Sequence, residues 1–68
     1  MNLKLLKDTR KKCKITQEEM AKALGYSGKA GYSWLETGKV KVTVEQSKVI
    51  KQVLCLTDEE YQKIFLLD

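Results

Sequence analysis

Residues 16–38 hold two helix-start signals on either side of a glycine turn, and this order limits the fold more than any other feature. Thr16 and Glu19 have the spacing of a capping box, in which two residues satisfy free N–H groups at a helix N-terminus. Apolar residues then recur at intervals of three and four as far as Gly25, a residue type that commonly follows a helix. The pattern predicts a helix that begins at Gln17 and ends at Gly25.

A second helix is predicted directly after this turn. Ser27 is of a residue type that caps helix N-termini. Tyr32 and Leu35 then share one helical face, and Gly38 lies about three turns later, where a helix can stop. Two short helices joined by a tight glycine turn form the supersecondary motif that many proteins use to read DNA.

Three further helices complete an all-α chain. Leu3, Leu6 and Cys13 fall on one face of a helix over residues 3–13. Two more capping boxes mark the starts of the remaining helices. These are expected at residues 44–54, after Thr43 and Gln46, and from residue 58 to the end, after Thr57 and Glu60. We therefore expect one domain of five helices spanning residues 1–68.

Residues 39–43 read Lys-Val-Lys-Val-Thr and allow two interpretations. Their alternation of charged and apolar side chains is typical of a short strand with one charged face. An isolated short strand has no obvious partner in this chain, which favours an extended linker instead. In the linker, Val40 and Val42 are expected to lean on the core.

Length and composition bound the kind of protein. A domain of 68 residues buries only about 60% of the surface of its unfolded chain, so a dimer partner or DNA would add stability. No apolar run approaches the roughly 20 residues of a membrane span, and no membrane contact is expected. Cys13 and Cys55 lack the spacing of a metal site and no His is present, so we expect two buried, reduced cysteines.

Charge is distributed unevenly along the chain. Six of the first fourteen residues are Lys or Arg and one is Asp, whereas residues 54–68 hold four acidic residues and one Lys. A basic surface favours a polyanion because each neutralised phosphate releases condensed counterions. The acidic end would then point away from it. Ordinary solvated helix faces explain the same charges, so charge alone does not decide.

Catalysis is not expected. The chain has no His, no Ser or Cys beside a positioned base, no paired catalytic carboxylates and no glycine-rich phosphate loop after a strand. The acidic residues 58–60 are explained by helix capping. We therefore expect no enzyme activity, no metal, no cofactor and no small-molecule ligand.

A set of residues in a particular order resembles the Cro and repressor helix-turn-helix family of phages and bacteria. These are Arg10, the run Ile15 to Glu19, Ala21, the run Leu24 to Ser27, Tyr32-Ser33, the run Leu35 to Lys39, and Leu54-Cys55-Leu56. The similarity spans about residues 3–57 and is specific because order and spacing agree together. It implies a five-helix DNA-binding domain that works as a homodimer on a pseudo-palindromic operator, in the cytoplasm of a bacterium or an infected host.

The chain departs from the usual family pattern around the second motif helix. The turn is one residue longer than in the shortest members, so that helix could begin at Ser27 or Gly28. Gly28 and Gly31 lie near its start, and an interior Gly costs about 1 kcal/mol relative to Ala, so fraying without DNA is expected. Trp34 stands where relatives generally carry a polar residue that faces the groove.

Candidate DNA contacts follow from the face left exposed when Tyr32 and Leu35 turn inward. Such residues can reach base edges or phosphates in the major groove. The candidates for base edges are Lys29, Ala30, Ser33 and Trp34. The candidates for the backbone, which positions the protein without reading sequence, are Gln17, Ser27, Gly28, Thr37, Lys39 and Lys41. For Trp34, packing against protein is an equal alternative.

Two other groups have expected structural roles. The resemblance pairs Arg10 with Glu36 in a salt bridge between the first helix and the end of the third. Tyr26 and Tyr32 are expected in the core rather than as stacking platforms. In the last helix, Tyr61, Ile64 and Phe65 are expected to pack against the domain. The candidates for a dimer interface are Phe65, Leu66 and Leu67.

These observations favour a sequence-specific regulator of transcription that binds double-stranded DNA. The resemblance implies a Cro-like homodimeric repressor, with no further domain for ligand sensing. The alternative is a protein-binding module of the same fold, such as an antirepressor or antitoxin-like protein, in which the glycine-weakened helix and Trp34 serve a protein partner.

Overall fold

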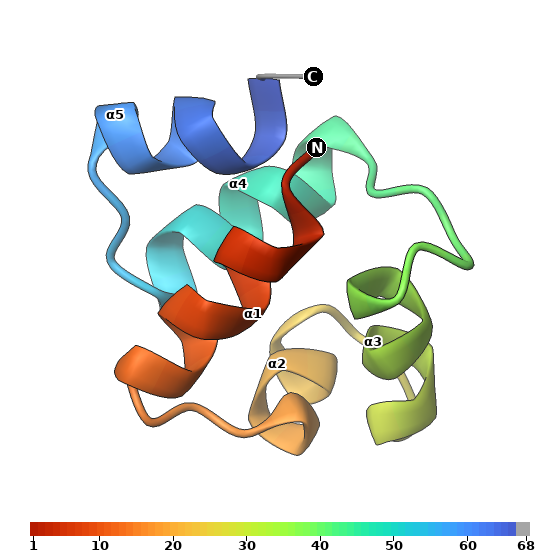
Figure 1. Cartoon of the computed structure of the whole chain (residues 1–68). Coiled ribbons are helices and arrows are strands. Elements are labelled where there is room, and N and C mark those ends of the chain that lie inside the picture. The colour runs from red at the N-terminus through yellow and green to blue at the C-terminus, as the bar shows by residue number, and fades with distance from the viewer. Residues whose placement is uncertain (67–68) are drawn as a thin grey trace.

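A computed structural model describes residues 1–66 as a bundle of short helices, with no strand in that range (Figure 1). The elements are α1 (Leu3–Lys12), α2 (Gln17–Ala23), α3 (Lys29–Glu36), α4 (Val44–Val53), α5 (Asp58–Tyr61) and the π-helical turn η1 (Gln62–Leu66). The all-α, five-helix fold expected from the sequence is confirmed. No helix among the described residues is both long and apolar enough to cross a bilayer.

All three capping boxes are present. In each, the Thr hydroxyl accepts from a backbone N–H three residues on, and the Glu or Gln side chain accepts from the Thr N–H. These contacts start α2, α4 and α5 at the residues expected from the sequence. Gly25 and Gly38 follow α2 and α3 with φ of +82° and +84°, the left-handed conformation that ends a helix at low cost for Gly.

The expected cap at Ser27 is wrong. Gly28 is the N-cap of α3, with φ −164° and no side-chain cap hydrogen bond. The reason lies in the longer turn after α2. The Tyr26 N–H donates to the Ala21 carbonyl at 2.9 Å, which holds Tyr26 within the turn and leaves Ser27 exposed before the helix starts.

One apolar core lies between α1, α2, α3, α4 and η1, and α5 contributes no buried residue to it. The core residues are Leu6, Met20, Ala21, Tyr32, Leu35, Ile50, Leu54, Leu56 and Ile64. Burial of large apolar side chains contributes roughly 1.5–3 kcal/mol each. The core is therefore what fixes the relative positions of helices too short to be stable alone.

The valines after α3 divide between core and solvent. The 39–43 segment is an extended linker without a strand. Val42 packs on the core as expected, but Val40 is exposed, so the expectation that it leans on the core is wrong. The Lys39 and Val40 N–H groups both donate to the Trp34 carbonyl, which keeps Val40 in the turn directly after α3. Val44, the first residue of α4, is 68% exposed.

The expectation of two buried cysteines is also wrong. Cys13 and Cys55 are both exposed free thiols. Cys13 caps the C-terminus of α1, and Cys55 follows α4 with φ +52°. Each cysteine therefore lies in the turn that follows a helix, beyond the helical residues that face the core.

The C-terminal segment widens from α5 into η1 instead of continuing as one α-helix. Ile64 is buried, and Phe65 packs beside Tyr61 with ring centroids 5.1 Å apart. The Asn2 N–H donates to the Ile64 carbonyl at 2.7 Å, so the two ends of the described chain lie together. Leu66 is exposed, and Leu67 lies outside the described residues.

Candidate nucleic-acid interface

The helices α2 and α3 form the most closely packed pair in the molecule. Gly31 lets α3 lie against the turn that joins it to α2, because a Cβ at that position would lie 2.7 Å from Cδ1 of the Tyr26 ring. Gly31 is therefore a packing residue as well as a weak helix former. Sequence analysis identified Gly31 as a helix-weakening residue but could not predict its contact with the Tyr26 ring.

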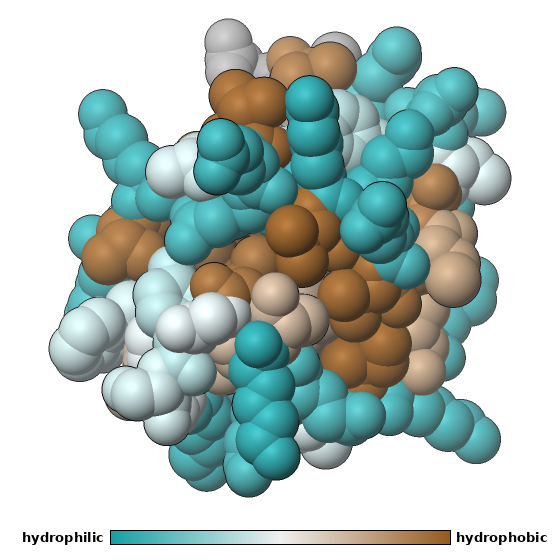
Figure 2. Space-filling model, turned by 180° about the vertical axis from the view of Figure 1, so that it is seen from behind, coloured by the Kyte–Doolittle hydropathy of each residue, from teal (hydrophilic) through white to brown (hydrophobic). Residues whose placement is uncertain are grey.

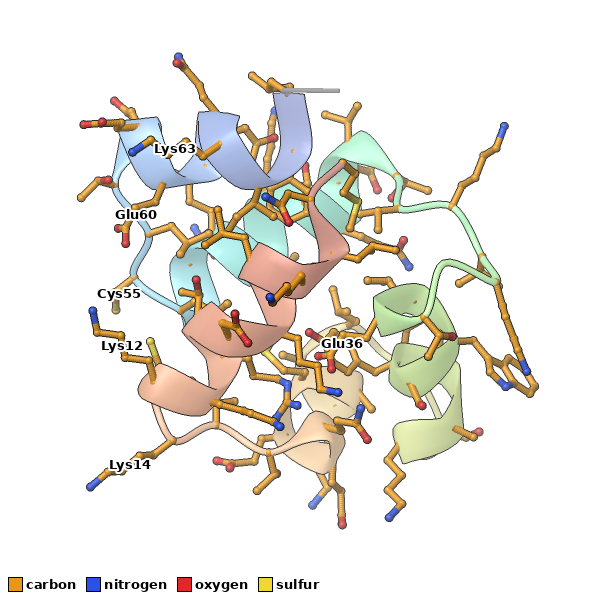
Figure 3. The ribbon with its side chains drawn as sticks, in the orientation of Figure 1. Lys12, Lys14, Glu36, Cys55, Glu60 and Lys63 are labelled. Atoms are coloured by element: carbon orange, nitrogen blue, oxygen red, sulfur yellow. The ribbon has the colours of Figure 1, made fainter. Side chains whose placement is uncertain are left out.

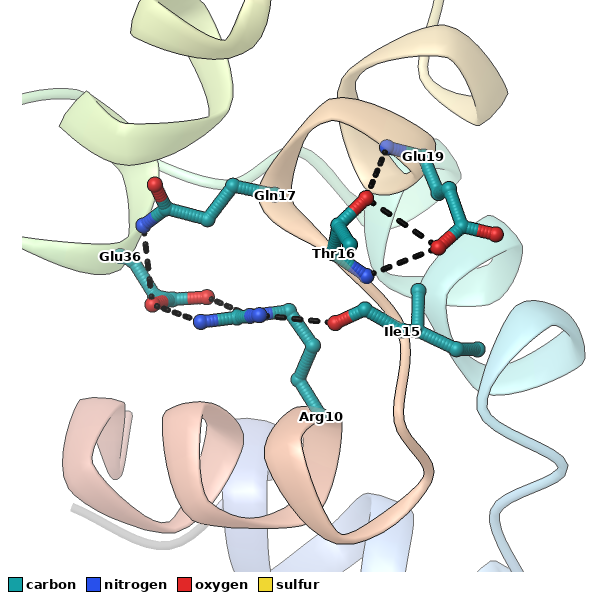
Figure 4. Close-up of polar contacts among 6 residues, drawn as sticks. All are labelled: Arg10, Ile15, Thr16, Gln17, Glu19 and Glu36. Atoms are coloured by element: carbon teal, nitrogen blue, oxygen red, sulfur yellow. Dashed lines mark hydrogen bonds and ion pairs between the residues drawn. The ribbon is translucent and has the colours of Figure 1, made fainter.

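A polar network fastens the N-terminus of α2 and the C-terminus of α3 to α1 (Figure 4). Arg10 Nε lies 2.7 Å from Glu36 Oε2, and Arg10 Nη2 lies 3.2 Å from Glu36 Oε1. Arg10 Nη1 also donates to the Ile15 carbonyl at 2.7 Å. Gln17 Nε2 donates to Glu36 Oε1 at 3.3 Å. One guanidinium thus holds three segments of chain together.

The ion pair in this network is buried, and burial and pairing shift the pKa values of its side chains. The side chains of Arg10 and Glu36 are only 8% and 3% exposed. Burial by itself raises the pKa of Glu36, but the hydrogen bonds and the charge of Arg10 outweigh it, so that pKa is lowered. The hydrogen bond to Glu36 raises the pKa of Arg10. Burial raises the pKa of Tyr32 strongly, so its hydroxyl stays protonated.

The outer face of α3 is open to solvent. Tyr32 and Leu35 are fully buried, whereas Lys29 and Ala30 are exposed. Ser33 is half-buried, and Trp34 is 50% exposed. The structure therefore brings the four residues proposed for base edges onto or beside one accessible surface.

The residues proposed for the DNA backbone flank that face. Ser27 and Gly28 lie exposed before α3, and Lys39 and Lys41 lie exposed after it. Thr37 caps α3 and donates its hydroxyl to the Trp34 carbonyl at 3.2 Å. Gln17 differs from the others because its amide nitrogen is bound to Glu36.

Two apolar grooves lie beside the linker that follows α3, and sequence reasoning missed both. The first, of about 560 Å³, we call the Val44 groove; its apolar lining is Met1, Leu3, Val40, Val42, Val44, Phe65 and Leu66. The second, of about 430 Å³, we call the Trp34 groove, and it is lined by Tyr26, Ser27, Gly28, Ala30, Gly31, Trp34 and Val40. Val40 lines both grooves, so the two grooves are neighbours at this residue. The Val-x-Val-x-Val alternation of residues 40–44 was the signal that could have found them.

Seen from behind, apolar surface gathers over α4 between hydrophilic side chains (Figure 2). Val49 and Val53 of α4 are half-buried, and Val53 packs against the core.

Acidic side chains are kept away from the α3 face. Asp58, Glu59 and Glu60 begin α5, which lies at the end of the bundle opposite α2 and α3 (Figure 1). Lys51 and Lys63 pair with Asp58 and Glu59 there. Figure 3 shows Glu60 and Lys63 at this far end, whereas Glu36 points into the space between α1 and α3. The lysines beside α3 therefore face solvent without nearby carboxylates from α5.

Comparison with known proteins gives one match. A family model described as a helix-turn-helix domain matches residues 4–63. No curated protein and no solved structure matches the chain.

Proposed function

This chain belongs to the helix-turn-helix domain family, and we propose that it regulates transcription by binding a specific double-stranded DNA site as a homodimer. Family membership indicates a DNA-binding regulator. The observation that carries the proposal is the exposed outer face of α3, held rigidly by the Arg10–Glu36 pair and flanked by exposed lysines. This is what a helix that enters the major groove requires.

The proposed contacts of α3 follow from side-chain chemistry. Lys29 would donate to O6 and N7 of a guanine, and Ala30 would contact a thymine methyl group. Ser33 would reach a base or a phosphate from its half-buried position. Trp34 would place its exposed ring against the groove wall as an apolar contact.

The flanking residues would fix the register of the protein on the duplex. Ser27 and Gly28 would approach one strand ahead of α3, and Thr37, Lys39 and Lys41 would follow the phosphates beyond it. Gln17 would use its amide oxygen or backbone, because its amide nitrogen is bound to Glu36. These contacts contribute affinity that falls with salt and do not discriminate sequence.

We assign the dimer surface to the Val44 groove. Val44 and Leu66 are 68% and 62% exposed on its edge, and Phe65 lies at its wall. Burial of this surface against a second copy would offset the small core of a 68-residue chain. Two α3 helices one turn of DNA apart, about 34 Å, would then read a pseudo-palindromic operator. We further propose that the bound dimer represses transcription by occupying a promoter.

A binding experiment tests the proposal. The protein is incubated with a random duplex library, bound DNA is selected and amplified, and the enriched site is compared with a scrambled duplex by electrophoretic mobility shift. We expect an enriched palindrome and a binding constant whose logarithm falls linearly with the logarithm of the salt concentration. Equal affinity for enriched and scrambled duplexes would overturn sequence-specific regulation.

A second candidate function rests on the Trp34 groove. Trp34 is half exposed beside an apolar hollow of about 430 Å³, which suits a protein partner as well as DNA. Trp34 is also the only tryptophan, so its fluorescence reports on this surface alone. A blue shift on adding the selected duplex favours the DNA contact. An unchanged spectrum with undiminished DNA binding favours a protein partner at this groove.

A further inference from the structure

The two exposed cysteines lie at neighbouring corners of the fold, on the side away from α3. Cys13 caps the end of α1, and Cys55 follows α4 in the loop before α5. Cys13 Sγ lies 3.7 Å from the carbonyl oxygen of Leu54, the residue directly before Cys55. The fold therefore brings together two thiols that are far apart in sequence.

The contact with the Leu54 carbonyl sets an upper limit on the distance between Cys13 Sγ and the backbone of Cys55. Across a planar trans peptide, the Leu54 oxygen lies about 2.8 Å from the Cys55 Cα. Cys13 Sγ is therefore no more than about 6.5 Å from that Cα by addition of the two lengths. Rotation of a Cys side chain between staggered rotamers moves its sulfur by about 3 Å. Both side chains are exposed, so neither rotation displaces core atoms.

Neighbouring contacts support the closeness of these corners. Cys55 Sγ lies 3.8 Å from the Gln52 carbonyl, which turns it back toward the end of α4. Lys12, beside Cys13, is close enough to Glu60 to help lower the pKa of that carboxyl, although its hydrogen bonds to Thr57 are the larger cause. Figure 3 shows Lys12, Cys55 and Glu60 along the same edge of the molecule.

We propose that Cys13 and Cys55 form a reversible disulfide, so that this domain carries a redox-sensitive crosslink. A peroxide is the oxidant. One thiolate attacks the peroxide oxygen to give a sulfenic acid and release water, and the second thiol then displaces hydroxide from that sulfur, which leaves as a second water. Two thiols are oxidised to one disulfide, and one hydrogen peroxide is reduced to two waters.

The crosslink would stabilise the fold without touching the α3 face. It would close a loop of about 40 residues that contains α2, α3 and α4, and so reduce the conformational freedom of the unfolded chain. We expect oxidation to raise the urea midpoint of unfolding by about 1 M or more. The site rests on the thiol geometry alone and is independent of the proposed DNA binding.

Intact-mass and thiol measurements test the proposal. The wild-type chain and the variants Cys13→Ser and Cys55→Ser are treated with one equivalent of hydrogen peroxide, then with dithiothreitol. We expect the wild-type monomer to lose about 2 Da and both titratable thiols, and to regain them on reduction. Neither variant should form this species, and circular dichroism checks that both remain folded.

Three results would overturn it. The wild-type chain could retain both free thiols, gain oxygen atoms as sulfinic acid, or form only disulfide-linked dimers whose yield rises with protein concentration. An intramolecular bond instead forms in a yield that does not depend on protein concentration, because each thiol meets its partner within one chain.

Discussion

Arg10 and Glu36 are 26 positions apart in sequence and form a bidentate ion pair inside the fold. The pair joins the last part of α1 to the last residue of α3, and Gln17 at the start of α2 binds the same carboxylate. Both ends of the two-helix motif are thus positioned by one buried charge pair. The direction in which α3 points from the domain depends on this contact.

Removal of one partner should destabilise the domain. Arg10→Met leaves the Glu36 carboxylate buried without its counter-charge, and we expect a loss of about 3–5 kcal/mol in the free energy of unfolding. Urea denaturation followed by circular dichroism measures it. The double variant Arg10→Met with Glu36→Met removes both charges and should cost less than the single one. A loss below about 1 kcal/mol in Arg10→Met would contradict the network.

The same pair should make stability depend on acid pH. The pKa of Glu36 is lowered from its ordinary 4.5, so the ionised carboxylate favours the folded state. Its contribution is fully present above pH 4.5 and is lost as the pH falls through the lower folded pKa. We therefore expect the free energy of unfolding to fall more steeply below pH 4.5 in the wild type than in Glu36→Gln. Parallel curves for the two proteins would exclude this source of acid sensitivity.

Substitutions of the two α3 glycines should act with opposite signs. Gly31→Ala places a Cβ 2.7 Å from the Tyr26 ring, and overpacking of this kind costs about 1–3 kcal/mol. That exceeds the helix-propensity gain of about 1 kcal/mol. Gly28→Ser meets open space at the N-cap and should add a few tenths of a kcal/mol. Thermal unfolding compares them, and a stabilised Gly31→Ala would show that the ring moves aside.

Lys29 should matter to DNA more than another lysine of equal charge. We expect Lys29→Ala to weaken binding of the selected duplex by about 1–3 kcal/mol if it reads a base. If Lys29 contacts a phosphate, the magnitude of the slope of the logarithm of the binding constant against the logarithm of salt concentration should decrease by about one in the variant. Lys48→Ala is the matched control, because exposed Lys48 lines a hollow beside Cys55 that includes no α3 residue. Equal losses in both variants would indicate general electrostatic attraction only.

The Val44 groove should control oligomeric state. Val44→Ser combined with Leu66→Ser removes the two most exposed apolar side chains of the groove. We expect the dimer of this variant to be weaker and to dissociate at a higher protein concentration than the wild-type dimer. Glu45→Ser is the control, since Glu45 is exposed next to Val44 and does not line the groove. Sedimentation measures both. Truncation after Tyr61 is a poorer test, because it also removes buried Ile64. An unchanged dimer in the double variant would exclude this surface.

Local signals in the sequence sufficed for most element boundaries. The Thr16, Thr43 and Thr57 boxes begin their helices where expected, and Gly25 and Gly38 end theirs. A capping box joins residues three positions apart, and a left-handed glycine is a property of one residue. Such features are therefore readable without knowledge of the rest of the fold. The start of α3 was missed because Gly28 has no capping side chain.

Some features of the candidate site were likewise predictable from the local sequence, and others depend on tertiary packing. The sequence by itself determined which side chains lie on the outer face of α3, because helical spacing turns Tyr32 and Leu35 inward. Only the tertiary structure decided that Gly31 meets Tyr26, that Val40 and Val44 line an open apolar groove, and that the cysteines share one edge. Those outcomes depend on how helices distant in sequence pack, and burial of a whole side chain is set by its neighbours in space.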